Sequence, residues 1–232
     1  ESREQNLEIP AVILCHGHSR HRNDGLHILA ETLAECGIAA FRFNFRGCGK
    51  NASNKYFEYC ASEWPYDLIQ AINYVQTLPF IDRERIGVAG ISMGACTTIY
   101  TAGMDKRVKS LVSMSGIGDC RQWMEYVWKS QGGDFTEFEK TVYERARISA
   151  ATGSAHMVNV LDMYHFPEKD RKDKIIEGFL DDEVSEYIAW ETMQELLMYK
   201  PIEHCSQISQ PIFFLVGGED FLVPKEQSEN MY

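Results

Sequence analysis

The sequence predicts an α/β fold in which a mostly parallel sheet carries helices on both faces. Along the first half of the chain, short apolar runs alternate with helical segments of about a dozen residues. Strands that alternate with helices join through right-handed crossovers, which make neighbouring strands parallel. The 232 residues, 44 % of them hydrophobic, can bury one sizeable core.

The first strand is predicted at residues 11–15, an apolar run followed by Gly17, as expected of a strand covered on both faces. A helix should follow, with Asn23 or Asp24 as its cap and Gly37 at its left-handed end. One face of this helix carries the apolar residues Leu26, Leu29, Ala30 and Leu33.

The same alternation continues to residue 114. We expect strands at residues 38–45, 86–91 and 108–114, and helices at residues 62–78 and 93–104. The helix over 62–78 places Leu68, Ala71, Ile72 and Val75 on one stripe.

The alternation stops over residues 117–200, which have helical character and are rich in Trp, Tyr, Met and charge. We interpret this stretch as a helical cap packed on an α/β core formed by residues 1–116 and 201–232. Residues 211–216 should resume the sheet.

Within the predicted cap, an acidic start at residues 181–183 precedes Val184, Tyr187 and Ile188, which fall on one helical face. We therefore expect an amphipathic helix there.

Composition argues against several classes of partner. Acidic residues outnumber basic ones 34 to 23, giving a net charge of −11, whereas surfaces that bind nucleic acid or anionic lipid are normally basic. No apolar run approaches the roughly 20 residues of a membrane helix, and no signal peptide is visible. We therefore expect a soluble protein. The seven cysteines are odd in number and contain no Cys-x-x-Cys pair that would suggest zinc or a redox centre, so we expect buried free thiols and a cytoplasmic location.

The sequence Gly90-Ile91-Ser92-Met93-Gly94 lies between a predicted strand and a predicted helix, which is the context of a G-x-S-x-G nucleophile elbow. The turn is so tight that side chains at 90 and 94 would collide with backbone. Ser92 would then project at a helix N-terminus, which favours the negative charge of acyl transfer, and Met93 would offer its N–H to an oxyanion hole. The alternative is a glycine-rich turn that only solves a packing problem.

His16-Gly17-His18 ends the first predicted strand, where hydrolases with this elbow form the other half of the oxyanion hole. The backbone N–H of His18 would be the donor. Alternatively, these are ordinary loop histidines, or a metal site built with His21. We expect no metal, because no carboxylate or thiolate lies beside them at ligand spacing.

The third feature is the run from Gly217 to Pro224, directly after the last predicted strand. In this order of strands the catalytic acid follows the nucleophile and orients a histidine. Glu219 and Asp220 are the carboxylates available, and the alternative is that they cap the next helix.

A histidine should follow the acid as general base, yet none occurs among the 12 residues after Asp220. His156, His165 and His204 lie between nucleophile and acid, in the wrong order. We therefore expect a C-terminal truncation that removes the base and a final strand.

On these motifs, the sequence resembles the α/β-hydrolase superfamily, and within it bacterial cinnamoyl/feruloyl-type esterases and their dienelactone-hydrolase-like and serine-peptidase-like relatives. The segments 43–49 and 82–87 add to the likeness. The resemblance implies Ser92 as nucleophile and the amides of His18 and Met93 as oxyanion hole. It favours Asp220 over Glu219 as acid, from its position relative to Gly217 and Pro224.

This family also implies strands ahead of residue 11, so both ends are expected to be trimmed. The sequence departs from the family's pattern at Asn44, where many relatives carry Asp, at His18, where an aromatic or small residue is commoner, and in the absent histidine.

In such enzymes a cap shapes the acyl pocket, which Trp123, Tyr126 and Trp128 would line. Ordinary packing within the cap is the alternative, and it is favoured because aromatic runs more often fill cores.

The sequence thus favours a carboxylic-ester hydrolase that acts on small molecules through an acyl-enzyme on Ser92, without a cofactor. A peptidase or thioesterase on the same site is an alternative, because the same triad cleaves amides and thioesters. A non-catalytic binding protein is another, if the histidine is truly absent. A homodimer is left open.

Overall fold

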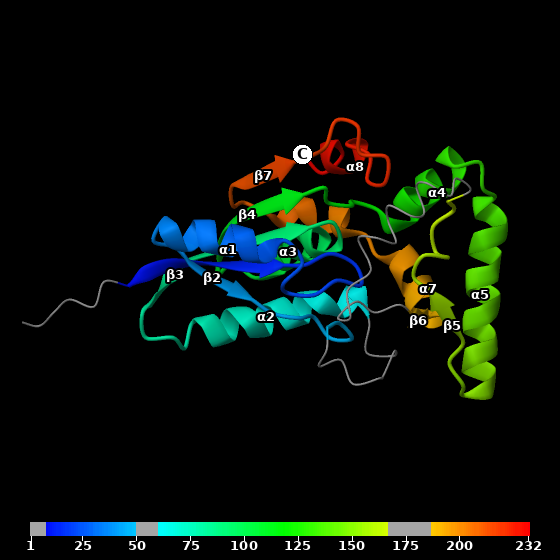
Figure 1. The fold of residues 1–232 in the computed structure, drawn as a ribbon, viewed down its shortest axis with the longest axis horizontal. Coiled ribbons are helices and arrows are strands. Elements are labelled where there is room, and N and C mark those ends of the chain that lie inside the picture. Colours follow the sequence, from blue (N-terminus) through cyan, green and yellow to red (C-terminus); the bar gives the residue numbers. More distant parts are fainter. Residues whose placement is uncertain (1–7, 50–59, 167–186) are drawn as a thin grey trace, which may run out of the picture.

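The computed structural model describes residues 8–49, 60–166 and 187–232. At its centre lies a parallel sheet with the strand order β2-β1-β3-β4-β7 (Figure 1). The predicted α/β architecture with a parallel sheet is therefore confirmed. The strands are β1 (Ile9–Cys15), β2 (Ala39–Arg42), β3 (Ile81–Ile91), β4 (Val108–Met114) and β7 (Ile212–Leu215).

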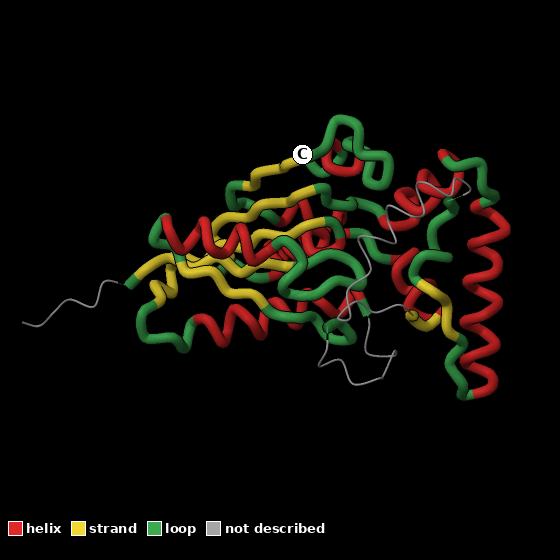
Figure 2. Tube along the Cα trace, viewed as in Figure 1, coloured by secondary structure: helices red, strands yellow, loops and turns green. Residues whose placement is uncertain are grey.

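Helices cover both faces of the sheet, as predicted (Figure 2). Helix α1 (Leu26–Glu35) packs with Leu14 on one face. On the other face, α2 (Trp64–Val75) and α3 (Met93–Met104) pack with Ile13 and Cys15. Successive side chains of a strand point to opposite faces, so β1 is apolar throughout because both of its faces are buried.

The predicted helix over 93–104 and strand over 108–114 match α3 and β4 residue for residue. Gly37 has φ 76°, the left-handed conformation expected after α1. The predicted cap of α1 is wrong: Gly25 precedes the helix, and no side chain caps it. The Asn23 side chain instead accepts a hydrogen bond from Arg42, on β2.

Residues 117–200 contain α4 (Cys120–Ser130), α5 (Phe135–Thr152), α7 (Trp190–Met198) and a two-stranded antiparallel ribbon. The ribbon consists of β5 (Met157–Asn159) and β6 (Tyr187–Ala189). These elements lie beyond the carboxyl ends of the sheet strands (Figure 1). The division into core and cap stays a prediction.

The helix predicted around Tyr187 and Ile188 is wrong where the structure describes it. These residues form β6 and pair with β5, and their exposed–buried alternation is that of a strand. The rest of that prediction, residues 181–184, lies outside the described residues.

The short helix η2 (Ala61–Glu63) directly precedes α2, and η3 (Pro201–Gln207) leads into β7. Helix α8 (Glu226–Glu229) follows this last strand. All seven cysteines are free thiols. No helix in the described part of the chain has the length and apolar character needed to span a membrane.

Candidate active site

Ser92 occupies the bend between β3 and α3. Its backbone has φ 52° and ψ −119°, a conformation that residues with a side chain rarely adopt. Its N–H donates to the Met114 carbonyl at 2.8 Å, and its own carbonyl accepts from the N–H groups of Ala95 and Cys96 at 2.9 and 3.1 Å. The bend is thus fixed to β4 on one side and to the first turn of α3 on the other, and the Ser92 residue is half-buried.

The glycines around Ser92 allow this bend. A Cβ at Gly90 would lie 2.3 Å from the carbonyl carbon and oxygen of Gly94. A Cβ at Gly94 would lie 2.3 Å from the Cys15 carbonyl oxygen and 2.4 Å from that of His16. Both contacts are with backbone, which cannot move aside as a flexible side chain can. The structure therefore requires glycine at positions 90 and 94, for the steric reason that the sequence analysis gave.

Of the two predicted oxyanion donors, Met93 follows Ser92 in the chain and His18 lies in the loop after β1. Met93 is the first residue of α3, and N–H groups in the first turn of a helix have no acceptor within the helix. His18 follows Gly17, where a Cβ would lie 3.6 Å from the Ser92 Cβ. The loop after β1 therefore approaches the serine, and the donor role of these two amides stays a prediction.

His16 is buried and connects the loop after β1 with the loop after β2. The Phe45 N–H donates to its Nε2 at 3.1 Å, so Nδ1 carries the proton and donates to the Gly17 carbonyl at 2.9 Å. Burial lowers the pKa of His16 to about 4. The ring meets those of Phe45 and Trp64 edge-on, at centroid distances of 5.0 and 5.5 Å. His16 is neutral and has both nitrogens engaged, so it can neither bind a metal nor act as the base.

The His18 side chain contacts a residue far along the chain. Its Nε2 lies 3.0 Å from the Met163 sulfur. Burial, with Arg20 nearby, lowers the pKa of His18 to about 3, so this ring too is neutral. In the described residues no group of three His, Cys, Asp or Glu side chains could hold a metal ion.

Asp220 is held by three donors. Its Oδ1 accepts from the N–H groups of Leu222 and Val223 at 3.0 and 2.9 Å, and its Oδ2 accepts from the Ser115 hydroxyl at 3.2 Å. It does not cap α8, because Lys225 precedes that helix. Glu219 is exposed.

Ser92, Ser115 and Asp220 follow three neighbouring strands, β3, β4 and β7. The Ser92 N–H bonds to the last residue of β4, and the Ser115 N–H bonds to the last residue of β7 at 2.8 Å. Two strand spacings, about 10 Å, separate the strand carrying the serine from the strand carrying the acid. An imidazole in this interval could hydrogen-bond to both, as the base of a catalytic triad does.

None of the seven histidines, all of which lie in the described residues, hydrogen-bonds to Ser92 or Asp220. His165 stacks on Trp128 at 5.1 Å, His204 lies 3.7 Å from the Tyr100 ring, and His156 precedes β5. The three histidines between nucleophile and acid in the sequence therefore do not supply the base.

The three aromatic residues predicted for an acyl pocket are not brought together. Trp123 is buried and donates from Nε1 to the Leu222 carbonyl at 2.7 Å. Trp128 stacks on Phe138 at 4.3 Å, and Tyr126 is exposed. Their pocket role stays a prediction, and the contacts of both tryptophans are those of ordinary packing.

Sequence reasoning missed Ser115, and it named Trp123 for the acyl pocket but missed the contact by which Trp123 holds the acid loop. Ser115 has φ 47° directly after β4, next to the strand that leads to Asp220. Its position one residue beyond a predicted strand was the available signal. Nothing in the sequence indicates the Trp123 contact.

Comparison with known proteins agrees with this arrangement. Residues 10–231 match the family described as alpha/beta hydrolase fold. An uncharacterized 31.7 kDa protein from the traX-finO intergenic region of Escherichia coli is 28 % identical over 232 residues, which cover 99 % of this chain and 79 % of that protein.

Two solved structures share the fold at lower identity. The alpha/beta hydrolase GrgF from Penicillium sp. has a TM-score of 0.78 and 18 % identity, over 97 % of this chain and 77 % of that chain. The Pyrococcus furiosus esterase Pf2001 has a TM-score of 0.62 and 17 % identity, over 98 % of this chain and 68 % of that chain. The family resemblance inferred from the motifs is therefore confirmed: the chain belongs to the alpha/beta hydrolase fold family.

Proposed function

We propose that the protein is a serine hydrolase that cleaves carboxylic esters of small molecules through an acyl-enzyme on Ser92. The observation that carries this proposal is the Ser92 bend: a serine with φ 52° and ψ −119°, between two glycines that backbone contacts require, at the N-terminus of α3. The esterase among the structural relatives supports the choice of ester.

In the proposed reaction, an imidazole takes the Ser92 proton as Oγ attacks the acyl carbon. The negative charge that develops on the carbonyl oxygen is met by the N–H groups of Met93 and His18. The imidazolium then protonates the leaving alcohol, and water hydrolyses the acyl-enzyme to release the acid. Asp220 would orient the imidazole and stabilise its charged form, and Ser115 would hold Asp220. None of the seven histidines in this sequence fills the place of that imidazole.

The test uses the full-length protein and combines turnover of a short-chain p-nitrophenyl ester with covalent labelling by a fluorophosphonate. The native protein should be labelled, and Ser92→Ala should lose both labelling and several powers of ten in rate. Ser110→Ala, which removes an exposed hydroxyl on β4, is the matched control and should behave like the native protein.

Unchanged labelling of Ser92→Ala would overturn the proposal. A folded native protein that is neither labelled nor active would overturn it in favour of a binding protein. Matched oxygen-ester, thioester and anilide substrates with one acyl group separate the remaining alternatives. We expect the highest kcat/KM for the oxygen ester, and a preference for either of the others would change the assignment.

A further inference from the structure

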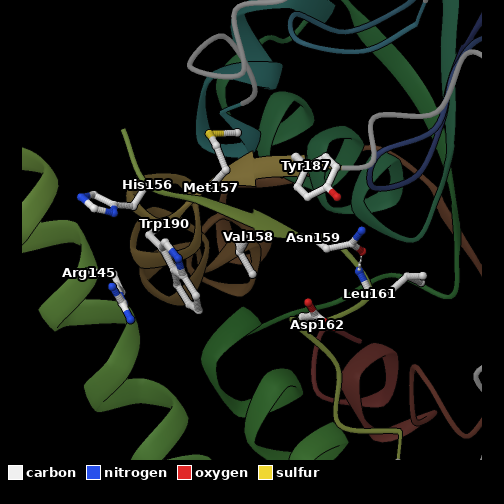
Figure 3. Close-up of a pocket in the computed structure, with 9 residues that line it drawn as sticks. All are labelled: Arg145, His156, Met157, Val158, Asn159, Leu161, Asp162, Tyr187 and Trp190. Carbon is white, nitrogen blue, oxygen red and sulfur yellow. Dashed lines mark hydrogen bonds between the residues drawn. The ribbon is translucent and has the colours of Figure 1, made fainter. Parts of the chain in front are cut away.

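A cavity of about 640 Å³ opens between α5 and the β5–β6 ribbon (Figure 3). Its volume is in the range of small-molecule sites. None of the residues that line it belongs to the proposed catalytic site. The cavity therefore needs an explanation of its own.

Two cationic or proton-donating side chains stand at one end of the cavity. Arg145 of α5 and His156 lie to one side of the Trp190 ring, whereas Asn159, Asp162 and Tyr187 lie on the other (Figure 3). Arg145 is exposed and makes no ion pair or hydrogen bond within the described residues. An unpaired guanidinium of this kind can bind a carboxylate through two parallel hydrogen bonds.

The walls of the cavity are joined by two hydrogen bonds made by the backbone of His156. The His156 N–H donates to the Ser149 hydroxyl of α5 at 3.2 Å, and the His156 carbonyl accepts from the Trp190 N–H at 3.0 Å. These bonds join α5, the start of β5 and the start of α7. The Trp190 indole is half-buried and offers an aromatic surface beside the cationic end. A preformed site of this kind costs little to order when a ligand binds.

We propose that this cavity binds a small aromatic carboxylate. The carboxylate would pair with the Arg145 guanidinium, in the two-bond geometry that arginine favours, with His156 as a further donor. The aromatic ring would lie against Trp190. The site would be separate from the acyl site at Ser92, so it stands whether or not the protein is a hydrolase.

Benzoate is the probe, and benzyl alcohol is its neutral match. Isothermal titration of the native protein should show saturable binding of benzoate and at least tenfold weaker binding of benzyl alcohol. Arg145→Gln should weaken benzoate binding by about tenfold or more, since hydrogen bonds to charged groups contribute that much. Arg147→Gln removes an exposed arginine of the same helix that does not line the cavity, and it should leave binding unchanged.

Equal affinity of Arg145→Gln and native protein, equal affinity for benzyl alcohol, or binding that does not saturate would each overturn the proposal. His156→Asn gives a second measurement at the same end of the cavity and should also weaken binding. Benzoate binding that falls in Ser92→Ala but not in Arg145→Gln would assign the ligand to the acyl site instead. Fluorophosphonate labelling of Arg145→Gln tests the hydrolase separately and should be unaffected.

Discussion

Gly94 shows how one missing methyl group sets the geometry of the candidate active site. Without a Cβ, the first turn of α3 can lie directly against the carbonyls of Cys15 and His16, at the end of β1. The same approach brings the loop that carries His18 next to Ser92. Gly94 therefore helps to position both Ser92 and the loop of His18, although it has no proposed contact with the substrate.

We expect Gly94→Ala to lower the free energy of unfolding by at least about 2 kcal/mol, because the new Cβ would collide with backbone. Gly218→Ala is the matched control: a Cβ there meets nothing within 4 Å, and its effect should stay within about 0.5 kcal/mol. Urea unfolding of both variants measures the difference. Equal stabilities would contradict the steric account.

At Asp220, charge and hydrogen bonding can be separated. Asp220→Asn keeps an oxygen for the N–H groups of Leu222 and Val223 but removes the negative charge that would orient the imidazole. We expect kcat/KM to fall by about 10³- to 10⁴-fold, with stability changed by less than about 1 kcal/mol. Steady-state kinetics beside Glu219→Gln, which should keep native activity, tests this. A large loss in the control and none in Asp220→Asn would reverse the assignment of the acid.

Among the elements, α4 holds the loop after β7, which carries Asp220, through one hydrogen bond. The Trp123 indole donates to the Leu222 carbonyl, and the Leu222 N–H in turn donates to Asp220. The loop after β7 is thus held on one side by Ser115, after β4, and on the other by a helix from residues 117–200. Trp123 is a positioning residue, since it acts on Asp220 only through Leu222.

Trp123→Phe keeps an aromatic ring but loses the hydrogen bond to the loop. We expect kcat to fall by several-fold with little change in KM, and stability to fall by about 1 kcal/mol. Tyr126→Phe, on the same helix and exposed, should change neither quantity. A rise in KM with kcat unchanged would indicate that Trp123 lines the substrate pocket, as its place in the sequence first suggested.

The elements whose bounds sequence reasoning predicted best are α3 and β4. Helix α3 is buried on nearly all of its sides and carries no amphipathic stripe, but it begins directly after the local turn formed by Ser92 and its two glycines. Strand β4 shows the alternation of a strand from Leu111 to Met114. The predicted cap of α1 was wrong because the two polar candidates, Asn23 and Asp24, lie two and one positions before Gly25, the residue that directly precedes the helix. The partners of Ser115 and Trp123 could not be predicted because they lie 105 and 99 residues away, a separation that no local pattern encodes.

For the molecule as a whole, two buried neutral histidines make stability depend on pH. The folded-state pKa values of His16 and His18 are about 4 and about 3, below the ordinary 6.5 of an unfolded chain. Between these values the unfolded state binds more protons, so stability is present above pH 6.5 and is lost as the pH falls toward 4.

Each of these histidines should remove about 2 kcal/mol between pH 7 and pH 5. His16→Gln should therefore show a smaller loss over this interval than the native protein, by about that amount. His27→Gln, an exposed histidine on α1, should keep the native pH dependence. Urea unfolding at the two pH values checks this, and an unchanged slope in His16→Gln would show that His16 is already charged in the folded protein.

The contact between Met163 and His18 has a consequence for how this protein can evolve. Met163 lies within residues 117–200, the predicted cap, whereas His18 belongs to the loop proposed for charge stabilisation. Selection for a new substrate that repacked this stretch would disturb the turnover rate in the same step. We expect lineages that change their substrates to carry paired replacements at these two positions.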